Sequence, residues 1–219
     1  MAKPKIYLLP GMGADSRLYE NLKLETADLK LINWKVPPAE ADLKDYAKLM
    51  LEEVEDPENA ILGGTSMGGI VAREMAEIVQ PKTLVLISSP ATVQEFSAMT
   101  ALGKPLKIWK LINQKSVERL GLVFERMMQI RTDDTKRIFN VMLKEANASS
   151  LRWSVKHILQ WEREEPFESY LQIAGEKDLL FPPTKMKSPI VIDKAGHLAV
   201  HENADVVSAA IDRYIRSLR

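Results

Sequence analysis

The sequence predicts an α/β fold, a doubly wound and mostly parallel sheet of about six strands with an inserted helical cap. Short apolar runs typical of strands alternate with helical patterns along most of the chain. Most of these runs are apolar at every position, as expected where helices cover both faces of a parallel sheet. The alternation stops once, in a long stretch that contains only helical patterns.

The predicted elements follow one another in βαβα order. The strands are expected at residues 5–9, 29–34, 60–62, 83–87, 170–174 and 189–192. The helices between and after them are expected at residues 16–22, 42–55, 67–79 and 204–218. Residues 91–166 contain three or four amphipathic stretches and no strand-like run, which predicts a cap inserted into the sheet domain. The expected organisation is therefore a core at 1–90 and 167–219, with the cap at 91–166.

Composition excludes several classes of function. The 219 residues are 46% hydrophobic and 27% charged, and thirty Lys plus Arg balance thirty Asp plus Glu. A net charge of zero gives no general attraction to nucleic acid or to anionic membranes. The absence of cysteine excludes disulfides, thiolate metal sites and a cysteine nucleophile, and it fits a reducing cytoplasm. We expect a cytoplasmic protein that is not exported, because the N-terminal apolar run from Ile6 to Leu9 is too short for the core of a signal peptide. We expect no insertion in a membrane, because no apolar run reaches eighteen residues.

The segment ILGGTSMGGIV, residues 61–71, contains the pattern Gly-x-Ser-x-Gly around Ser66. A phosphate-binding loop would need a lysine after its last glycine, and Ile70 stands there instead. The remaining interpretation is a nucleophile elbow, in which a strand turns directly into a helix and displays the serine at the tip. Gly64 and Gly68 fit this interpretation, because the tight turn leaves no room for side chains two residues before and after the serine.

A serine nucleophile needs a base to take its proton and an acid to orient that base. Of the three histidines, His197 follows the strand at 189–192 and precedes the last helix, so its loop lies at the carboxyl end of the sheet. The turn after the strand at 170–174 offers two acids, Glu176 and Asp178. We favour Asp178, because Gly175 lets the chain turn and two prolines then redirect it.

The oxyanion formed by attack on a carbonyl needs two N–H donors. Met67, directly after Ser66, supplies one at a helix N-terminus, whose dipole also favours negative charge. Met12 is expected to supply the other from the glycine-flanked turn after the first strand.

The cap helix LRWSVKHILQWE carries apolar residues on two sides. Trp153, His157 and Trp161 recur at a spacing of four residues and share one of these sides. We favour packing on both sides. The alternative is that these three side chains bind the substrate or meet a second subunit, which leaves a homodimer open.

These motifs, in this order, resemble those of the α/β-hydrolase superfamily, and the resemblance covers nearly the whole chain. The matching segments are GTSMGG, AGEKDLLFPP and KAGH. The resemblance implies that Ser66 is the nucleophile, Asp178 the acid and His197 the base, with Met12 and Met67 forming the oxyanion hole. Pro10 replaces the histidine that usually precedes the glycine of the oxyanion loop, and the chain starts at the family's third strand, so about six strands are expected.

The expected function is hydrolysis of a small carboxylic ester or thioester through an acyl-enzyme, with a small-molecule acyl substrate and with no metal or organic cofactor. One alternative is a lyase or another non-hydrolytic enzyme that uses the same three residues. Another is a binding protein that has lost the chemistry of this scaffold.

Overall fold

The computed structural model describes residues 3–38 and 40–218, and its centre is a parallel sheet of six strands in the order β2-β1-β3-β4-β5-β6. The fold class and the number of strands are confirmed. The strands are β1 (Lys5–Leu9), β2 (Asp28–Leu31), β3 (Ile61–Thr65), β4 (Thr83–Ile87), β5 (Tyr170–Gly175) and β6 (Ile190–Ile192).

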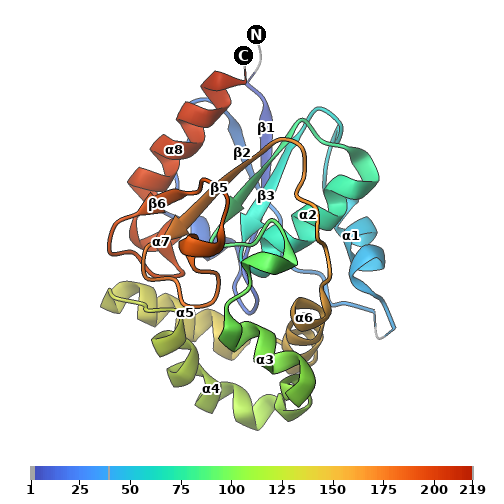
Figure 1. The fold of residues 1–219 in the computed structure, drawn as a ribbon, viewed down its shortest axis with the longest axis vertical. Helices are drawn as coiled ribbons and strands as arrows, with labels where there is room; N and C mark the ends of the chain where they lie inside the picture. The colour runs from blue at the N-terminus through green and yellow to red at the C-terminus, as the bar shows by residue number, and fades with distance from the viewer. Residues whose placement is uncertain (1–2, 39, 219) are drawn as a thin grey trace.

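Helices cover both faces of the sheet (Figure 1). One face packs against α1 (Leu43–Leu51) and α2 (Met67–Val79), and the other against the 3₁₀ helix η1 (Ser16–Tyr19) and α8 (Ala204–Ser217). Strand β1 shows why two covers are needed, because successive side chains point to opposite faces. Ile6 and Leu8 enter the core beneath η1 and α8, whereas Tyr7 and Leu9 enter the core beneath α1 and α2.

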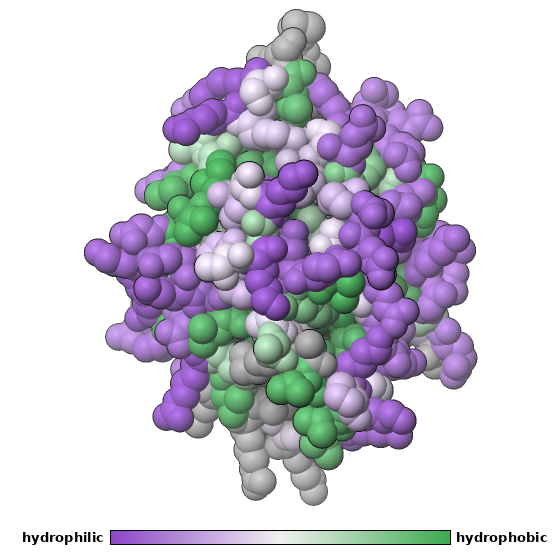
Figure 2. Space-filling view, viewed as in Figure 1, coloured by the Kyte–Doolittle hydropathy of each residue, from purple (hydrophilic) through white to green (hydrophobic). Residues whose placement is uncertain are grey.

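The chain between β4 and β5 contains only helices and 3₁₀ helices, here called the helical insertion, and its helices gather at one end of the sheet (Figure 1). They are α3 (Ala98–Leu106), α4 (Gln114–Met127), α5 (Asp133–Glu145) and α6 (Ala148–Gln160), with the 3₁₀ helices η2 (Val93–Glu95) and η3 (Ile108–Leu111). Hydrophilic residues are spread over much of the face in Figure 2, and apolar ones gather over the insertion at its lower end. Leu102, Leu106 and Leu111 of the insertion are exposed apolar residues.

Three predicted elements are clearly shorter than expected. The helix predicted at 42–55 ends as α1 at Leu51, because the N–H groups of Glu53 and Val54 bond three residues back, to the carbonyls of Met50 and Leu51, and form turns rather than a further α-helical turn.

The helix predicted at 16–22 is reduced to η1. The N–H of Leu22 still bonds to the carbonyl of Tyr19 in a turn, whereas the N–H of Lys23 leaves the segment and donates to Ser208 Oγ on α8 at 3.1 Å. The strand predicted at 29–34 stops at Leu31, since this edge strand pairs only with β1, and Leu31 lies opposite Leu8 near the end of β1. The 3₁₀ helix η4 (Pro183–Lys185) and the short α7 (Ala199–Glu202) were not predicted.

Among residues 3–38 and 40–218, no helix combines the length and the apolar character that crossing a bilayer requires.

The turn from β3 into α2 is packed so closely that two of its glycines touch backbone. A Cβ atom on Gly64 would lie 2.5 Å from the carbonyl oxygen of Leu9, and one on Gly68 would lie 2.1 Å from the same oxygen. Side chains cannot occupy such distances, and the obstacle is backbone that cannot rotate away. The start of α2 therefore rests directly on the end of β1, which brings residue 66 beside the loop that follows β1.

We predict that Gly68→Ala destabilises the protein by about 3 kcal/mol, because α2 must move away from β1 to admit the methyl group. Urea unfolding followed by circular dichroism measures this loss. Gly11→Ala is the matched control. Its Cβ would have 3.6 Å to its nearest neighbours, Ser66 Cβ and the Thr65 carbonyl oxygen, so its stability should stay within about 0.5 kcal/mol of wild type. Equal stabilities of the two variants would contradict the close packing described for this turn.

Candidate active site

Ser66 occupies the tip of the turn in a backbone conformation that residues other than glycine seldom adopt. Its φ is 55° and its ψ is −122°, and the next residue, Met67, begins α2. The N–H of Ser66 donates to the carbonyl of Ile87 on β4 at 3.0 Å, which anchors the turn to the neighbouring strand. The Ser66 hydroxyl does not cap the helix. This strained geometry leaves the hydroxyl free to point away from the backbone.

A buried polar network that the sequence analysis missed lies behind the turn. Ser89 Oγ donates to the carbonyl oxygen of Ser66 at 2.8 Å, and Gln172 Nε2 donates to the carbonyl oxygen of Ser89 at 3.0 Å. Gln172 Nε2 also lies 2.6 Å from Glu95 Oε2, and burial raises the pKa of Glu95. The signal for this network was Gln172 itself, a polar residue in the middle of an otherwise apolar strand.

His197 and Asp178 form a buried pair. His197 Nδ1 lies 2.7 Å from Asp178 Oδ2, and both side chains are fully buried. The other carboxylate oxygen of Asp178 accepts hydrogen bonds from the N–H groups of Leu180 at 2.9 Å and Phe181 at 3.1 Å. Since both oxygens are held, the carboxylate has one fixed orientation toward the imidazole. A histidine oriented this way can accept a proton at Nε2.

Asp178, rather than Glu176, is the acid that reaches this histidine. Glu176 points to the surface, where Lys177 and the N–H of Lys194 bind its carboxylate and lower its pKa to about 2. The preference for Asp178 therefore agrees with the geometry.

His197 and Ser66 face the same cavity, although no hydrogen bond joins them. His197 Nε2 is buried and has no hydrogen-bond partner among the described residues. Both residues line a cavity of about 270 Å³ that lies beneath the helical insertion. Hydrogen bonds between a nucleophile and its base are often long in a protein without substrate. The structure thus brings Ser66, His197 and Asp178 to one place.

The other two histidines have structural partners. His201 Nδ1 lies 2.8 Å from Thr135 Oγ1 and its Nε2 lies 3.2 Å from Glu20 Oε1. His157 Nδ1 bonds to the carbonyl of Trp153, one turn earlier in α6, at 2.8 Å. Neither histidine lines the cavity at Ser66.

Met12 and Met67 differ in their surroundings. Met12 follows β1 and lines the cavity, whereas the Met67 side chain is fully buried between the sheet and α2. As the first residue of α2, Met67 has an N–H without an acceptor inside the helix. The loop of Met12 is supported from the side of Trp34, whose Nε1 donates to the carbonyl of Gly11 at 2.9 Å.

The cavity at Ser66 is lined almost entirely by apolar side chains. Four methionines and three phenylalanines contribute to it, and none of its described lining residues is Lys, Arg, Asp or Glu. The apolar part is formed by Met12, Ala14, Leu18, Ile108, Phe124, Met127, Met128, Phe139, Met142, Ile158, Leu159, Leu180, Phe181 and Leu198. Its polar groups, apart from Thr100, belong to the segments around Ser66 and His197.

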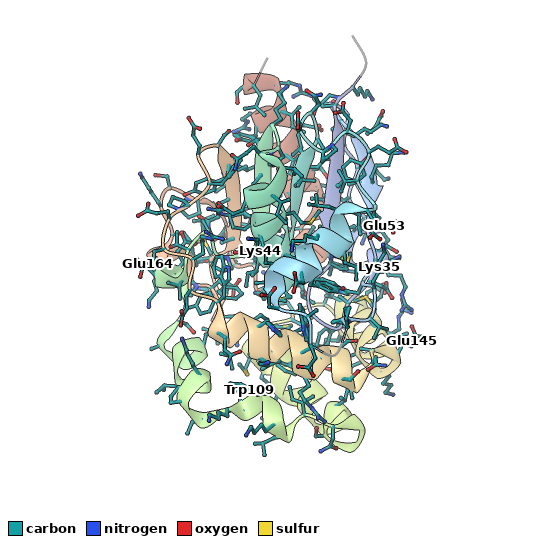
Figure 3. The ribbon with its side chains drawn as sticks, turned by 90° about the vertical axis from the view of Figure 1, so that its right-hand side faces the viewer. Lys35, Lys44, Glu53, Trp109, Glu145 and Glu164 are labelled. Carbon is teal, nitrogen blue, oxygen red and sulfur yellow. The ribbon has the colours of Figure 1, made fainter. Side chains whose placement is uncertain are left out.

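Trp153, His157 and Trp161 do not line this cavity, so the alternative in which they bind the substrate there does not hold, and the packing that we favoured fits their positions. They lie on the opposite side of α6 and attach it to the sheet domain. Trp153 packs against Tyr46 of α1 with ring centroids 4.7 Å apart, and Trp161 Nε1 donates to Glu74 of α2 at 2.8 Å. Figure 3 shows α6 passing below α1, with Trp109 of η3 on the far side of α6 from α1.

The residues of α6 that do line the cavity are Ile158 and Leu159. They belong to the second apolar side of the helix, for which the sequence suggested only packing. The periodicity identified two apolar sides, and it could not tell which one faces the nucleophile.

Comparisons with known proteins agree with this geometry. Residues 6–210 match the model of the alpha/beta hydrolase family. A pimeloyl-[acyl-carrier protein] methyl ester esterase from Pseudoalteromonas atlantica is 28% identical over 140 residues, which cover 58% of this chain and 53% of that protein. The chain thus spans about half the length of this curated relative.

Solved structures share the fold at low sequence identity. MenH from S. aureus is 17% identical with a TM-score of 0.74, and the match covers 100% of this chain and 96% of that one. The enol-lactonase from Burkholderia xenovorans is 13% identical with a TM-score of 0.72, covering 99% of this chain and 92% of that one. Since the family model covers nearly the whole chain and the fold, the turn at Ser66 and the buried His–Asp pair agree with it, the chain belongs to the alpha/beta hydrolase family.

Proposed function

We propose that the protein is a serine hydrolase that cleaves a carboxylic ester or thioester through an acyl-enzyme. The observation that carries the proposal is the shared cavity of Ser66 and His197, in which Ser66 is held at a strained turn and His197 is oriented by buried Asp178. The curated relative, an esterase, supports the same class of reaction.

In this mechanism Ser66 Oγ attacks the carbonyl carbon of the ester, and His197 Nε2 takes the hydroxyl proton. The N–H groups of Met67 and Met12 stabilise the negative oxygen of the tetrahedral intermediate. His197 then gives its proton to the leaving alcohol or thiol as the carbon–oxygen or carbon–sulfur bond breaks. A water molecule, deprotonated by the same histidine, attacks the acyl-enzyme and releases the carboxylic acid and the free Ser66 hydroxyl.

Asp178 acts on His197 rather than on the substrate. Its hydrogen bond to Nδ1 places the proton on that nitrogen, so that Nε2 is the acceptor. The carboxylate also stabilises the imidazolium that forms when Ser66 is deprotonated. The two backbone N–H groups on its other oxygen prevent it from turning away.

A lyase would use the same residues to move protons without forming an acyl-enzyme. The two reactions differ in products, because only the hydrolase releases one equivalent each of acid and alcohol from a simple ester. Turnover on p-nitrophenyl esters therefore distinguishes them.

We predict that a fluorophosphonate probe labels the wild type and does not label Ser66→Ala, since the probe reacts with an activated serine. In-gel fluorescence measures the labelling. Ser149→Ala, which removes an exposed hydroxyl at the start of α6, is the control and should label like the wild type. Labelling that persists in Ser66→Ala would exclude Ser66 as the nucleophile.

We predict that Asp178→Asn lowers kcat on a p-nitrophenyl ester by about 10³- to 10⁴-fold with little change in KM, because the imidazole loses its orientation and its correct tautomer. Steady-state kinetics measure both constants. Glu176→Gln, two residues earlier and at the surface, should keep kcat within about twofold of wild type, as expected for a surface substitution. A similar loss in both variants would indicate a general effect on the loop and count against the role of Asp178.

A further inference from the structure

The cavity at Ser66 contains polar groups that can bind a carbonyl and, among its described lining residues, no side chain that can pair with a charged group of a substrate. Ser66 and His197 can hold a carbonyl group, and no lysine or arginine among the described lining residues can pair with a carboxylate. An unpaired charge in apolar surroundings loses its hydration without compensation. A substrate whose acyl part carries a charged group would therefore be rejected.

The lining also indicates the shape of the acyl group. Met12, Met127, Met128 and Met142 are unbranched and adapt their conformation to what they contact. A volume of about 270 Å³ holds roughly nine water-sized groups at ~30 Å³ each, and a methylene is of similar size. These properties fit a flexible apolar chain of medium length.

Gly103 of α3 packs against two residues of the cavity wall, Leu159 and Ile108. Leu159 and Ile108 line the cavity, whereas Gly103 does not. A Cβ atom on Gly103 would lie 3.0 Å from both Cδ atoms of Leu159 and 3.1 Å from Cδ1 of Ile108. These contacts are the ends of flexible side chains, so an added methyl group would push them toward the empty space of the cavity.

We propose that the cavity binds the uncharged, medium-length apolar acyl chain of the substrate, and that Gly103 sets the length of chain that it accepts. The inference rests on the proposed function, because it takes Ser66 as the group that the substrate carbonyl approaches. The proposal names the substrate class of that reaction. It also names Gly103 as a residue that sets specificity without touching the substrate.

Binding to the Ser66→Ala variant tests the substrate class without any turnover. Calorimetry should show that methyl octanoate binds at least tenfold more tightly than monomethyl suberate, which has the same chain length and a terminal carboxylate. Affinity should rise about fourfold for each methylene from methyl butanoate to methyl octanoate. Equal affinities for methyl octanoate and monomethyl suberate would overturn the proposal.

The role of Gly103 is tested by Gly103→Ala in the same Ser66→Ala background. Alanine favours the helix, so α3 should form. Methyl octanoate should bind at least fivefold more weakly, and methyl butanoate should bind within twofold of the parent. Leu159→Phe places a larger side chain directly in the cavity wall and should weaken methyl octanoate binding in the same way. It replaces Gly103→Ala as the test if that variant does not fold.

Gly121→Ala is the matched control. It makes the same change inside α4, where the nearest atoms belong to Asn140 at 3.3 Å and Leu143 at 3.5 Å, and neither residue lines the cavity. It should leave both affinities unchanged. If Gly103→Ala and Gly121→Ala have the same chain-length profile, Gly103 does not set the length.

These outcomes separate the inference from the proposed function. A wild type that binds methyl octanoate selectively but does not hydrolyse p-nitrophenyl octanoate would overturn the hydrolase and leave the chain site standing. A wild type that hydrolyses p-nitrophenyl acetate and octanoate equally well, with no selectivity in binding, would overturn the chain site alone.

Discussion

The contact between Gly68 and the carbonyl oxygen of Leu9 is the constraint on which the rest of the site depends. Because no side chain separates the start of α2 from the end of β1, the chain must reverse within the residues around Ser66. The resulting positive φ at Ser66 costs free energy, on the order of 1–3 kcal/mol. Hydrogen bonds from the Ser66 N–H to β4 and from Ser89 to the Ser66 carbonyl offset part of that cost. A strained serine is thus held by backbone packing rather than by its own side chain.

The helical insertion supports the histidine as well as covering the serine. The N–H of His197 donates to the carbonyl of Met128 at 2.8 Å, directly after α4, and a Cβ atom on Gly196 would lie 2.4 Å from that same oxygen. Arg131 reaches the carbonyl of Lys194 from the same turn. Since the Met128 side chain also lines the cavity, one residue of the insertion contacts both the space for substrate and the loop of the proposed base. Movement of this turn would therefore disturb the position of the imidazole.

The sequence predicted the elements and residues that depend on local chemistry. The parallel sheet was predicted from the continuous apolar runs. The turn at Ser66 was predicted from Gly64 and Gly68, and the structure shows that a side chain at either position would collide with backbone. Asp178 and His197 could be placed because parallel strands end at the same edge of a sheet. The orientation of α6 could not be predicted, since two apolar stripes on one helix are equivalent until their neighbours are known. Trp153 and Trp161 were therefore candidates for the side that faces the substrate, although Ile158 and Leu159 line the cavity. The Ser89–Gln172–Glu95 network was equally hidden, because it joins residues from three separate segments.

The central claim is that Ser66 becomes covalently acylated while His197 and Asp178 handle the proton. Rapid quenching of wild-type protein mixed with a p-nitrophenyl ester, followed by mass spectrometry, measures this directly. The account predicts a protein species heavier by the acyl group within the first turnover, with the added mass on the peptide that contains Ser66. The account also predicts that this species decays at a rate consistent with steady-state turnover. Release of p-nitrophenol without such a species, or an acyl group on a different residue, would contradict it.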